Sequence, residues 1–280
     1  MTWHASLQLD YKRDASSAAP RTVAHFRHDG PLRILQSLYP EGDAICHNVL
    51  VHPPGGLVGG DTLDIRVSVG ENAHGLVTTP GATRFYRSDA DLAVQRVRVD
   101  MASGSRLEWL PLEALAYNDC KALNEATFAL APGAELIGWD VTAFGLPHAQ
   151  QPYLRGRFQQ HLEIPGVWLE RGRVDATDAS LMDGPLGMAG HRCLATLFFA
   201  TGTALTRERR EIALDAARRV MDMHGLRDTA GATSPHDQVI AVRVLAPVVE
   251  PAMDLLRQVW RAWRRELWQL GGEQPRIWST

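Results

Sequence analysis

The sequence predicts a mainly β protein with two α-helices toward its C-terminus. Three observations support this: short runs in which apolar and polar residues alternate, glycine-containing breaks between these runs, and helical periodicities that begin only after residue 205. The runs follow one another at the spacing of a many-stranded antiparallel architecture, and no regular alternation of strand with helix is present. Because no internal repeat or linker divides the 280 residues, we expect a single domain over residues 1–280.

Strand-like runs extend from residue 24 to about residue 173. The clearest covers 63–69, where Leu63, Ile65, Val67 and Val69 alternate with polar residues and predict a strand with one buried face. The same period predicts strands at 97–101 and 137–143, with a weaker version at 158–164. Glycines separate these runs, at positions 70, 104, 133, 145 and 166.

Two helices follow, with one strand between them. Thr206 is suited to cap a helix that ends near Gly225. Its expected apolar stripe consists of Ile212, Ala213, Ala216, Ala217, Val220 and His224. The nearly continuous apolar run 239–246 predicts a strand buried on both faces. A second helix is expected to begin near Pro251. Its apolar stripe consists of Leu256, Val259, Trp260, Trp263, Leu267 and Leu270.

Composition excludes several classes of protein. A formal charge of −3 and a pI near 6.4 do not provide the positive field of a general nucleic-acid binder. The first residues lack the apolar segment of a secretory signal, and the apolar stretch 193–205 is too short and broken to span a membrane. The three cysteines, Cys46, Cys120 and Cys193, do not form a disulfide framework. We therefore expect a cytoplasmic protein without a membrane segment, and the roles of these cysteines stay open.

Two loops rich in glycine and proline have unusually defined shapes. The first consists of His52, Pro53, Pro54, Gly55, Gly56, Leu57, Val58, Gly59, Gly60 and Asp61. It lacks both phosphate-loop patterns, so it is interpreted either as a tight corner between strands or as a loop for a partner. The second loop, 78–87, contains the turn residues Thr79, Pro80 and Gly81, followed by Arg84, Tyr86 and Arg87. A surface turn is its plain interpretation, although Arg84 and Arg87 are able to reach a nearby carboxylate.

No complete metal or catalytic set is predicted. In an extended strand Cys46 and His52 point away from His47, so these residues and Asp61 do not assemble a tetrahedral site without outside ligands. His191 and Cys193 share a face but supply only two ligands. No catalytic serine elbow is present. A hydrolase that uses His52 and Asp61 in a glycine-rich β pocket remains the alternative from the enzyme class.

Two further groups of residues are functional candidates. Asp140 and Glu170 lie among apolar strand positions, where a carboxylate is either a structural ion-pair member or part of a polar passage. In the last helix Trp260 and Trp263 lie on the apolar stripe and are expected in the core. Arg261, Arg265 and Trp268 are the candidates for contact with a partner, with a solvated basic face as the alternative.

An ordered series of motifs resembles the urease accessory protein family UreD, also called UreH. The series covers nearly the whole chain: GPLR at 30–33, LYPEG at 38–42, the two loops above, LEWLP at 107–111, GWD at 138–140, AGH at 189–191 and PRIW at 275–278. Residues 112–117 and 228–238 depart from the usual family pattern, which leaves the local contacts of Glu113 open.

The resemblance implies a fold, partners and a function. The fold is a β-helix-like stack of many short strands with two α-helices. The function is that of a non-enzymatic scaffold for nickel insertion, working with UreF, the GTPase UreG and urease apoprotein. Nickel passes transiently, GTP belongs to UreG, and no tightly bound cofactor is implied. Asp61, Asp140 and Glu170 match motif positions proposed to conduct nickel through an internal passage, for which spaced carboxylates suit weak binding better than a Cys/His cage.

Overall fold

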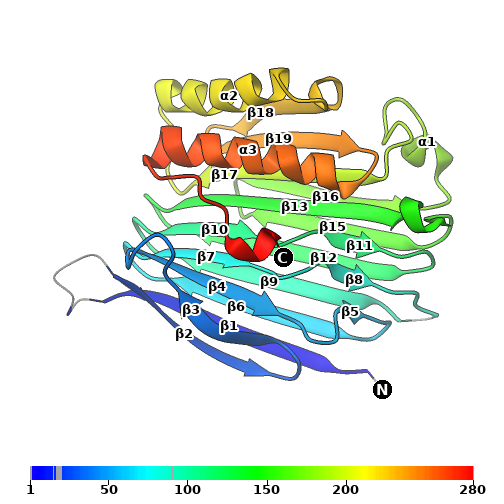
Figure 1. Cartoon of the computed structure of the whole chain (residues 1–280), viewed down its shortest axis with the longest axis horizontal. Helices are drawn as coiled ribbons and strands as arrows, with labels where there is room; N and C mark the ends of the chain where they lie inside the picture. Colours follow the sequence, from blue (N-terminus) through cyan, green and yellow to red (C-terminus); the bar gives the residue numbers. More distant parts are fainter. Residues whose placement is uncertain (1, 15, 17–20, 90, 280) are drawn as a thin grey trace.

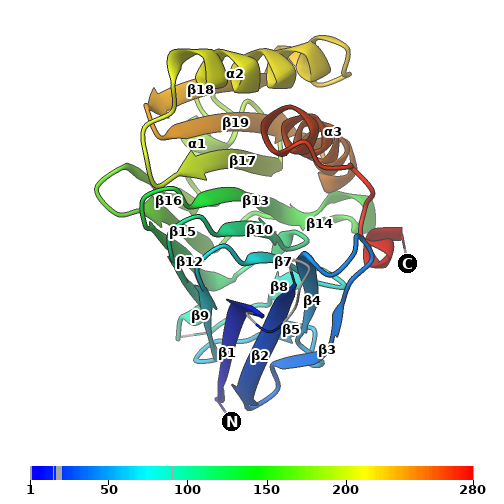
Figure 2. The same ribbon diagram turned by 90° about the vertical axis from the view of Figure 1, so that its left-hand side faces the viewer.

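The computed structural model describes residues 2–14, 16, 21–89 and 91–279. Within them, two β-sheets pack face to face, and two long helices lie along the outer face of one sheet (Figures 1 and 2). Sheet A has the strand order β16 (Trp168–Asp175), β15 (Arg157–Ile164), β12 (Lys121–Leu130), β9 (Ala93–Met101), β6 (Thr62–Val69), β1 (His4–Arg13), β2 (Thr22–Asp29).

Sheet B is larger and carries short strands beside its main path. Its main order is β18 (Ala230–His236), β19 (Val239–Ala246), β17 (Cys193–Thr201), β13 (Glu135–Leu146), β10 (Arg106–Leu110), β7 (His74–Thr78), β4 (Ile45–Val51), β3 (Arg33–Leu38). The short strands are β5 (Gly56–Leu57), β8 (Thr83–Phe85), β11 (Ala114–Ala116) and β14 (Gln151–Pro152).

The central strands form a β-helix-like stack, as the resemblance implied. The chain alternates between the sheets, from β4 in sheet B to β6 in sheet A, back to β7, and onward through β9, β10, β12, β13 and β15. Within each sheet, a strand pairs in parallel with the strand from the preceding turn of the β-helix. Ile65 of β6 is therefore beside Val97 of β9, and Val97 is beside Ala126 of β12. The antiparallel pairing expected from the spacing of the runs is therefore wrong for the centre of both sheets. An alternating pattern determines which face is buried, but it does not determine which strand is the neighbour.

The strands predicted from alternation are confirmed, with additions at both ends. β6, β9, β13 and β15 cover the predicted runs, and β19 matches the predicted strand at 239–246. Strands also begin earlier than predicted, with β1, and β17 accounts for the apolar stretch after Cys193. The outer pairs, including β1 with β2 and β17 with β19, are antiparallel.

Both predicted helices are present. In α2 (Arg207–Asp222), the Thr206 side chain accepts a hydrogen bond from the Arg209 N–H at 3.2 Å, as expected of a cap. The predicted stripe needs correction. Ile212 is 38% exposed and His224 lies beyond the last residue of the helix, whereas the buried residues are Ala213, Ala216, Ala217 and Met221. The longer helix is α3 (Val249–Trp268). The short helices, which no pattern in the sequence predicted, are α1 (Ala179–Met182), η1 (Pro147–Ala149), η2 (Arg227–Thr229) and η3 (Arg276–Ser279).

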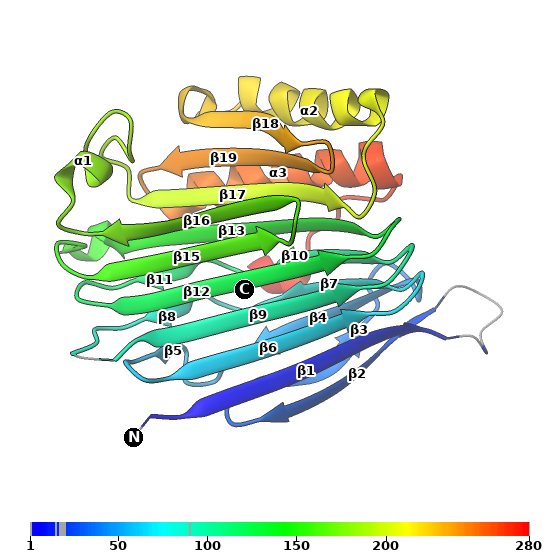
Figure 3. The same cartoon turned by 180° about the vertical axis from the view of Figure 1, so that it is seen from behind.

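Two apolar cores result from this arrangement. One lies between the sheets, and the other lies between sheet B and the helices α2 and α3. Figure 3 shows the opposite side, where no helix among the described residues covers sheet A. In the described part of the chain, no helix combines the length and apolar character needed to cross a bilayer.

The two ends of the stack differ. At one end short glycine turns such as 70–73 and 102–105 connect the sheets. At the other end, drawn on the right in Figure 1, lie β5, β8, β11 and α1 with the long connections around them. We call this second end the loop end; both glycine- and proline-rich loops belong to it.

Candidate functional site

The two glycine- and proline-rich loops lie side by side at the loop end. β5 in the first loop pairs with β8 in the second, which places Gly56 beside Arg84 and Leu57 beside Phe85. Position 56 requires glycine, because a Cβ atom there would collide with the Tyr86 ring. Gly60 has a φ of +90°, which also favours glycine. The first loop is thus a tight corner between strands, and close packing against the second loop fixes its shape.

A cavity of about 220 Å³ lies beneath these loops. Residues of both loops line it together with inward-facing residues of the two sheets. The polar lining side chains are His52, Thr79, Thr83, Arg84 and Gln95. The cavity therefore connects the loop end with the space between the sheets.

Asp61 holds the first loop in place. Its Oδ1 accepts a hydrogen bond from the Trp3 N–H at 3.2 Å, and its Oδ2 accepts one from the Val58 N–H at 3.0 Å. The residue is 1% exposed. These contacts engage both carboxylate oxygens with backbone donors, which is a structural role.

His52 lines the cavity without forming a dyad with Asp61. Its ring packs against Trp3 at 5.0 Å between centroids, and no hydrogen bond joins it to Asp61 in the described residues. Burial lowers the pKa of His52, and the negative charge of Asp61 only partly opposes this. Because the described residues show no hydrogen bond between His52 and Asp61, and because backbone donors engage the Asp61 carboxylate, this geometry does not favour the hydrolase alternative.

The second loop is also held by local hydrogen bonds. Thr79 Oγ1 donates to the Gly81 carbonyl at 3.0 Å and accepts from the Leu112 N–H at 2.8 Å. Of the two arginines expected to reach a carboxylate, Arg87 does so, pairing with Asp89 at 3.0 Å on the surface. Arg84 has no ion pair within the described residues and borders the cavity instead. Pro53, Pro54 and Pro80 are exposed, and the Tyr86 ring packs on Tyr117 with centroids 4.9 Å apart.

A line of polar side chains crosses the otherwise apolar space between the sheets. We call it the interior polar row; its members are Gln95, Asn124, Asp140, Gln160, Glu170, Thr196 and Arg243. Neighbouring register positions of sheet A provide Gln95, Asn124 and Gln160, on β9, β12 and β15. Neighbouring positions of sheet B provide Asp140, Thr196 and Arg243, on β13, β17 and β19.

Hydrogen bonds link the first half of the row into a chain. Gln95 Nε2 donates to Asn124 Oδ1 at 3.1 Å, and Asn124 Nδ2 donates to Asp140 Oδ2 at 2.9 Å. Gln160 Nε2 donates to Asp140 Oδ1 at 2.6 Å. Because Gln95 also lines the cavity, the chain of polar groups runs from the cavity to the Asp140 carboxylate.

Glu170 forms the other half of the row. Its Oε1 accepts from Thr196 Oγ1 at 2.9 Å, and its Oε2 accepts from Arg243 Nε at 2.9 Å. Thr196 is also the direct cross-strand neighbour of Asp140. The structure therefore brings two of the three predicted passage residues together around Thr196 and leaves Asp61 with the loop.

The environment of Asp140 disfavours its charge. Burial first, and then the negative charge of Glu170, raise the pKa of Asp140 to about 6 from its ordinary value of 3.8. Hydrogen bonds from Thr142 and Asn124 act in the opposite direction. A carboxylate kept under such conditions is a typical mark of a functional site.

Asp140→Asn is expected to stabilise the fold at neutral pH. Since the folded-state pKa lies above the ordinary value, the wild-type carboxyl contributes stability below about pH 4 that is lost as the pH rises through about 6. The amide does not ionise, and Gln160 can rotate its own amide to offer an oxygen. Urea unfolding should show an advantage that grows with pH and reaches about 2–3 kcal/mol near pH 8.

A control with the opposite sign is available. Hydrogen bonds from Thr177, followed by the nearby Arg157, lower the pKa of Asp175, so Asp175→Asn should lose stability relative to wild type as the pH rises. If the stability gained by Asp140→Asn over wild type were the same at acid and at neutral pH, ionisation of the Asp140 carboxyl would not be its cause.

The three partner-contact candidates of α3 have different surroundings. Arg261 and Arg265 are exposed; Arg261 Nε donates to the Gly272 carbonyl at 3.0 Å, and Arg265 pairs with Glu266 at 3.1 Å. Trp268 is only 5% exposed, and its Nε1 donates to Glu135 Oε2 at 2.5 Å. The Trp268 ring is therefore part of the second core in this chain, because it closes the space between α3 and sheet B.

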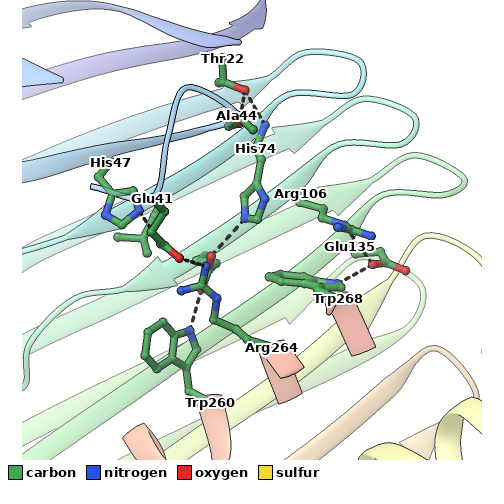
Figure 4. A network of polar contacts seen from close by, with 12 residues as sticks. Thr22, Glu41, Ala44, His47, His74, Arg106, Glu135, Trp260, Arg264 and Trp268 are labelled. Carbon is green, nitrogen blue, oxygen red and sulfur yellow. Dashed lines mark hydrogen bonds and ion pairs between the residues drawn. The ribbon is translucent and has the colours of Figure 1, made fainter. Parts of the chain in front are cut away.

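A buried ionic network joins α3 to sheet B (Figure 4). Arg264, which is fully buried, pairs with Glu41 at 2.6 Å and lies 3.6 Å from Glu108. Glu108 accepts from Trp260 Nε1 at 2.6 Å and contacts His74 Nε2 at 3.1 Å. Burial alone would raise the pKa of Glu108, but His74, Arg264 and Trp260 together hold it below its usual range. We call this group the α3 network; its position beneath a helix indicates a structural role.

Sequence reasoning missed several members of both groups. A usable signal existed for Asn124 and Gln160, because each occupies an inward position of an alternating run in which a core residue is expected. Arg243 and Arg264 gave no such signal, since their partners are distant in sequence. Among the described residues, no three His, Cys, Asp or Glu side chains are arranged to hold a metal ion. The three cysteines are buried and unpaired.

Comparison with known proteins adds an independent observation. The model of the family described as UreD urease accessory protein matches residues 4–279. Curated relatives named urease accessory protein UreD include those of Paracidovorax citrulli, 70% identical over 279 residues, and Variovorax paradoxus, 65% identical over 280 residues. A third, from Leptothrix cholodnii, is 53% identical over 280 residues. In each case the similarity covers 100% of both chains.

Proposed function

Because the chain belongs to the UreD family of urease accessory proteins, we propose that it is a non-catalytic scaffold for the insertion of nickel into urease. Its proposed partners are UreF, the GTPase UreG and urease apoprotein. GTP is assigned to UreG, and nickel is a transient cargo rather than a resident cofactor. The proposed location is the cytoplasm, with which three unpaired cysteines agree.

The interior polar row is the observation that supports this proposal most. Polar side chains in the core of a β-sheet sandwich are unfavourable unless they are satisfied or serve a purpose. Here amide, hydroxyl and carboxylate oxygens follow one another across adjacent strands from a cavity at the loop end to Glu170. Such oxygen donors bind a divalent transition metal weakly, whereas a set of thiolates and imidazoles would retain it.

The proposed route has an order. Nickel enters at the cavity beside His52 and Gln95, passes Asn124, and meets its first carboxylate at Asp140. The second carboxylate is Glu170, reached past Thr196. Asp61 is placed outside the route in this proposal, because it anchors the loop that borders the cavity.

Partner contact is proposed at two exposed places. The loop end carries the side chains Arg84 and Arg87, and α3 carries Arg261 and Arg265. Arginine is enriched at protein interfaces, and these positions leave the α3 network and both cores intact.

The proposal is tested in cells that express urease together with UreF and UreG. Removal of this chain is expected to abolish urease activity and urease-bound nickel, and re-expression of the full chain is expected to restore both. Affinity purification through this chain should recover UreF, UreG and urease. Full urease activity and nickel content without the chain would overturn the proposal.

A further inference from the structure

Arg243 occupies the point where the interior polar row meets solvent. Its side chain is 42% exposed, while that of its partner Glu170 is 21% exposed. Two guanidinium nitrogens contact the same carboxylate oxygen, Nη2 at 2.6 Å and Nε at 2.9 Å. The guanidinium also lies over the Trp168 ring, 6.0 Å from its centroid. Arg243 therefore covers the solvent side of Glu170.

Charge balance explains why a cation and Arg243 compete for the row. With Arg243 in place, the guanidinium neutralises Glu170, so this end of the row has little net attraction for a cation. A divalent ion between the two carboxylates would supply two positive charges and would be repelled by a guanidinium on the same carboxylate. Binding becomes favourable when the guanidinium leaves.

The surroundings allow that movement. Arginine has a long side chain, and its charged head is readily placed in water while the stem stays on an apolar surface. The Trp168 ring, 8% exposed and packed on Phe198 with centroids 5.4 Å apart, supplies such a surface. Thr196 keeps its hydrogen bond to Oε1, so Glu170 remains oriented toward the row after Arg243 departs.

We propose that Arg243 is a displaceable counter-ion that closes the Glu170 end of the row and sets its affinity for divalent cations. This inference rests on the proposed function, because it assigns the control of the same passage. In this proposal Arg243 is a positioning residue. It does not bind the nickel ion itself but acts on nickel binding through Glu170.

The test is a calorimetric titration of Ni²⁺ into the full chain at pH 7, without a polyhistidine tag. Arg243→Met removes the charge and retains an apolar stem against Trp168, so Ni²⁺ is expected to bind about tenfold more tightly than to wild type. Arg243→Lys, which keeps a charge beside Glu170, should stay near the wild-type affinity. Arg171→Met is the matched control, because this arginine follows Glu170 directly and is exposed.

The double variant Arg243→Met with Glu170→Gln identifies the ligand. It should lose the whole gain in affinity if Glu170 is the carboxylate that Arg243 blocks. The inference is overturned if Arg243→Met unfolds cooperatively like wild type but binds Ni²⁺ no more tightly, or if the gain persists in the double variant.

Urease activity in cells separates this inference from the proposed function. If Arg243→Met gains Ni²⁺ affinity while cells lacking the whole chain still load urease with nickel, the control by Arg243 stands and the proposed function fails. If cells need the chain but Arg243→Met leaves Ni²⁺ affinity unchanged, the proposed function stands and this inference fails.

Discussion

Glu108→Ala is expected to destabilise the fold by about 3–5 kcal/mol, a large effect for a single substitution. Removing this fully buried carboxylate leaves the equally buried Arg264 with Glu41 as its one remaining ion-pair partner in the described structure. It also leaves Trp260 Nε1 and His74 Nε2 without the acceptor that they share. Urea unfolding of the full chain at pH 7 measures the loss.

Two further variants show whether the α3 network is the cause. Glu108→Gln retains an oxygen for Trp260 and should lose less stability than the alanine variant. Glu125→Ala removes a partly exposed carboxylate, 24% exposed, that pairs with Arg96 at 3.2 Å, and it should cost less than about 1 kcal/mol. If Glu108→Ala and Glu125→Ala had the same free energy of unfolding, the α3 network would not be what holds α3 in place.

The double variant Asp140→Asn with Glu170→Gln is expected to reduce urease activation in cells by about tenfold or more. Both amides preserve shape and part of the hydrogen bonding, but they remove the two negative charges that attract a cation along the row. A tenfold change corresponds to about 1.4 kcal/mol, which is modest for the removal of two charged ligands. Urease activity and nickel content per urease subunit are the measurements.

The matched control replaces two carboxylates of sheet A that point away from the row. Glu125→Gln with Glu163→Gln makes the same change of charge on β12 and β15, at positions beside Arg96 and His161. This control should activate urease like wild type. If both double variants activate urease fully, a scaffold without nickel transit is the correct description, provided that UreF and urease are still recovered with the chain.

Local patterns were sufficient wherever burial depends on neighbours in sequence. The alternation at 63–69 predicted β6 and its buried face, and Thr206 predicted the start of α2. The same patterns failed at Ile212, because the width of the buried stripe depends on how closely α2 approaches its neighbours. There the small residues Ala213, Ala216 and Ala217 form the contact.

Pairs of distant residues could not be predicted in this way. Arg264 and Glu41 are 223 positions apart, and Arg243 and Glu170 are 73 positions apart. The alternation of polar and apolar residues shows which way a side chain points along its own strand, but contains no information about the strand that faces it.

The sequence by itself determined the mainly β class, the buried face of alternating strands such as β6, the two long helices and, through its ordered motifs, the family. Tertiary structure alone decided that the central strands are parallel, that Trp268 closes a core, and that Asp140 and Glu170 belong to one polar row while Asp61 anchors a loop. The reason is that alternation and capping are properties of adjacent residues. Parallel stacking and buried charge pairs instead arise from the register between coils, which is set only when the two sheets pack around their common core.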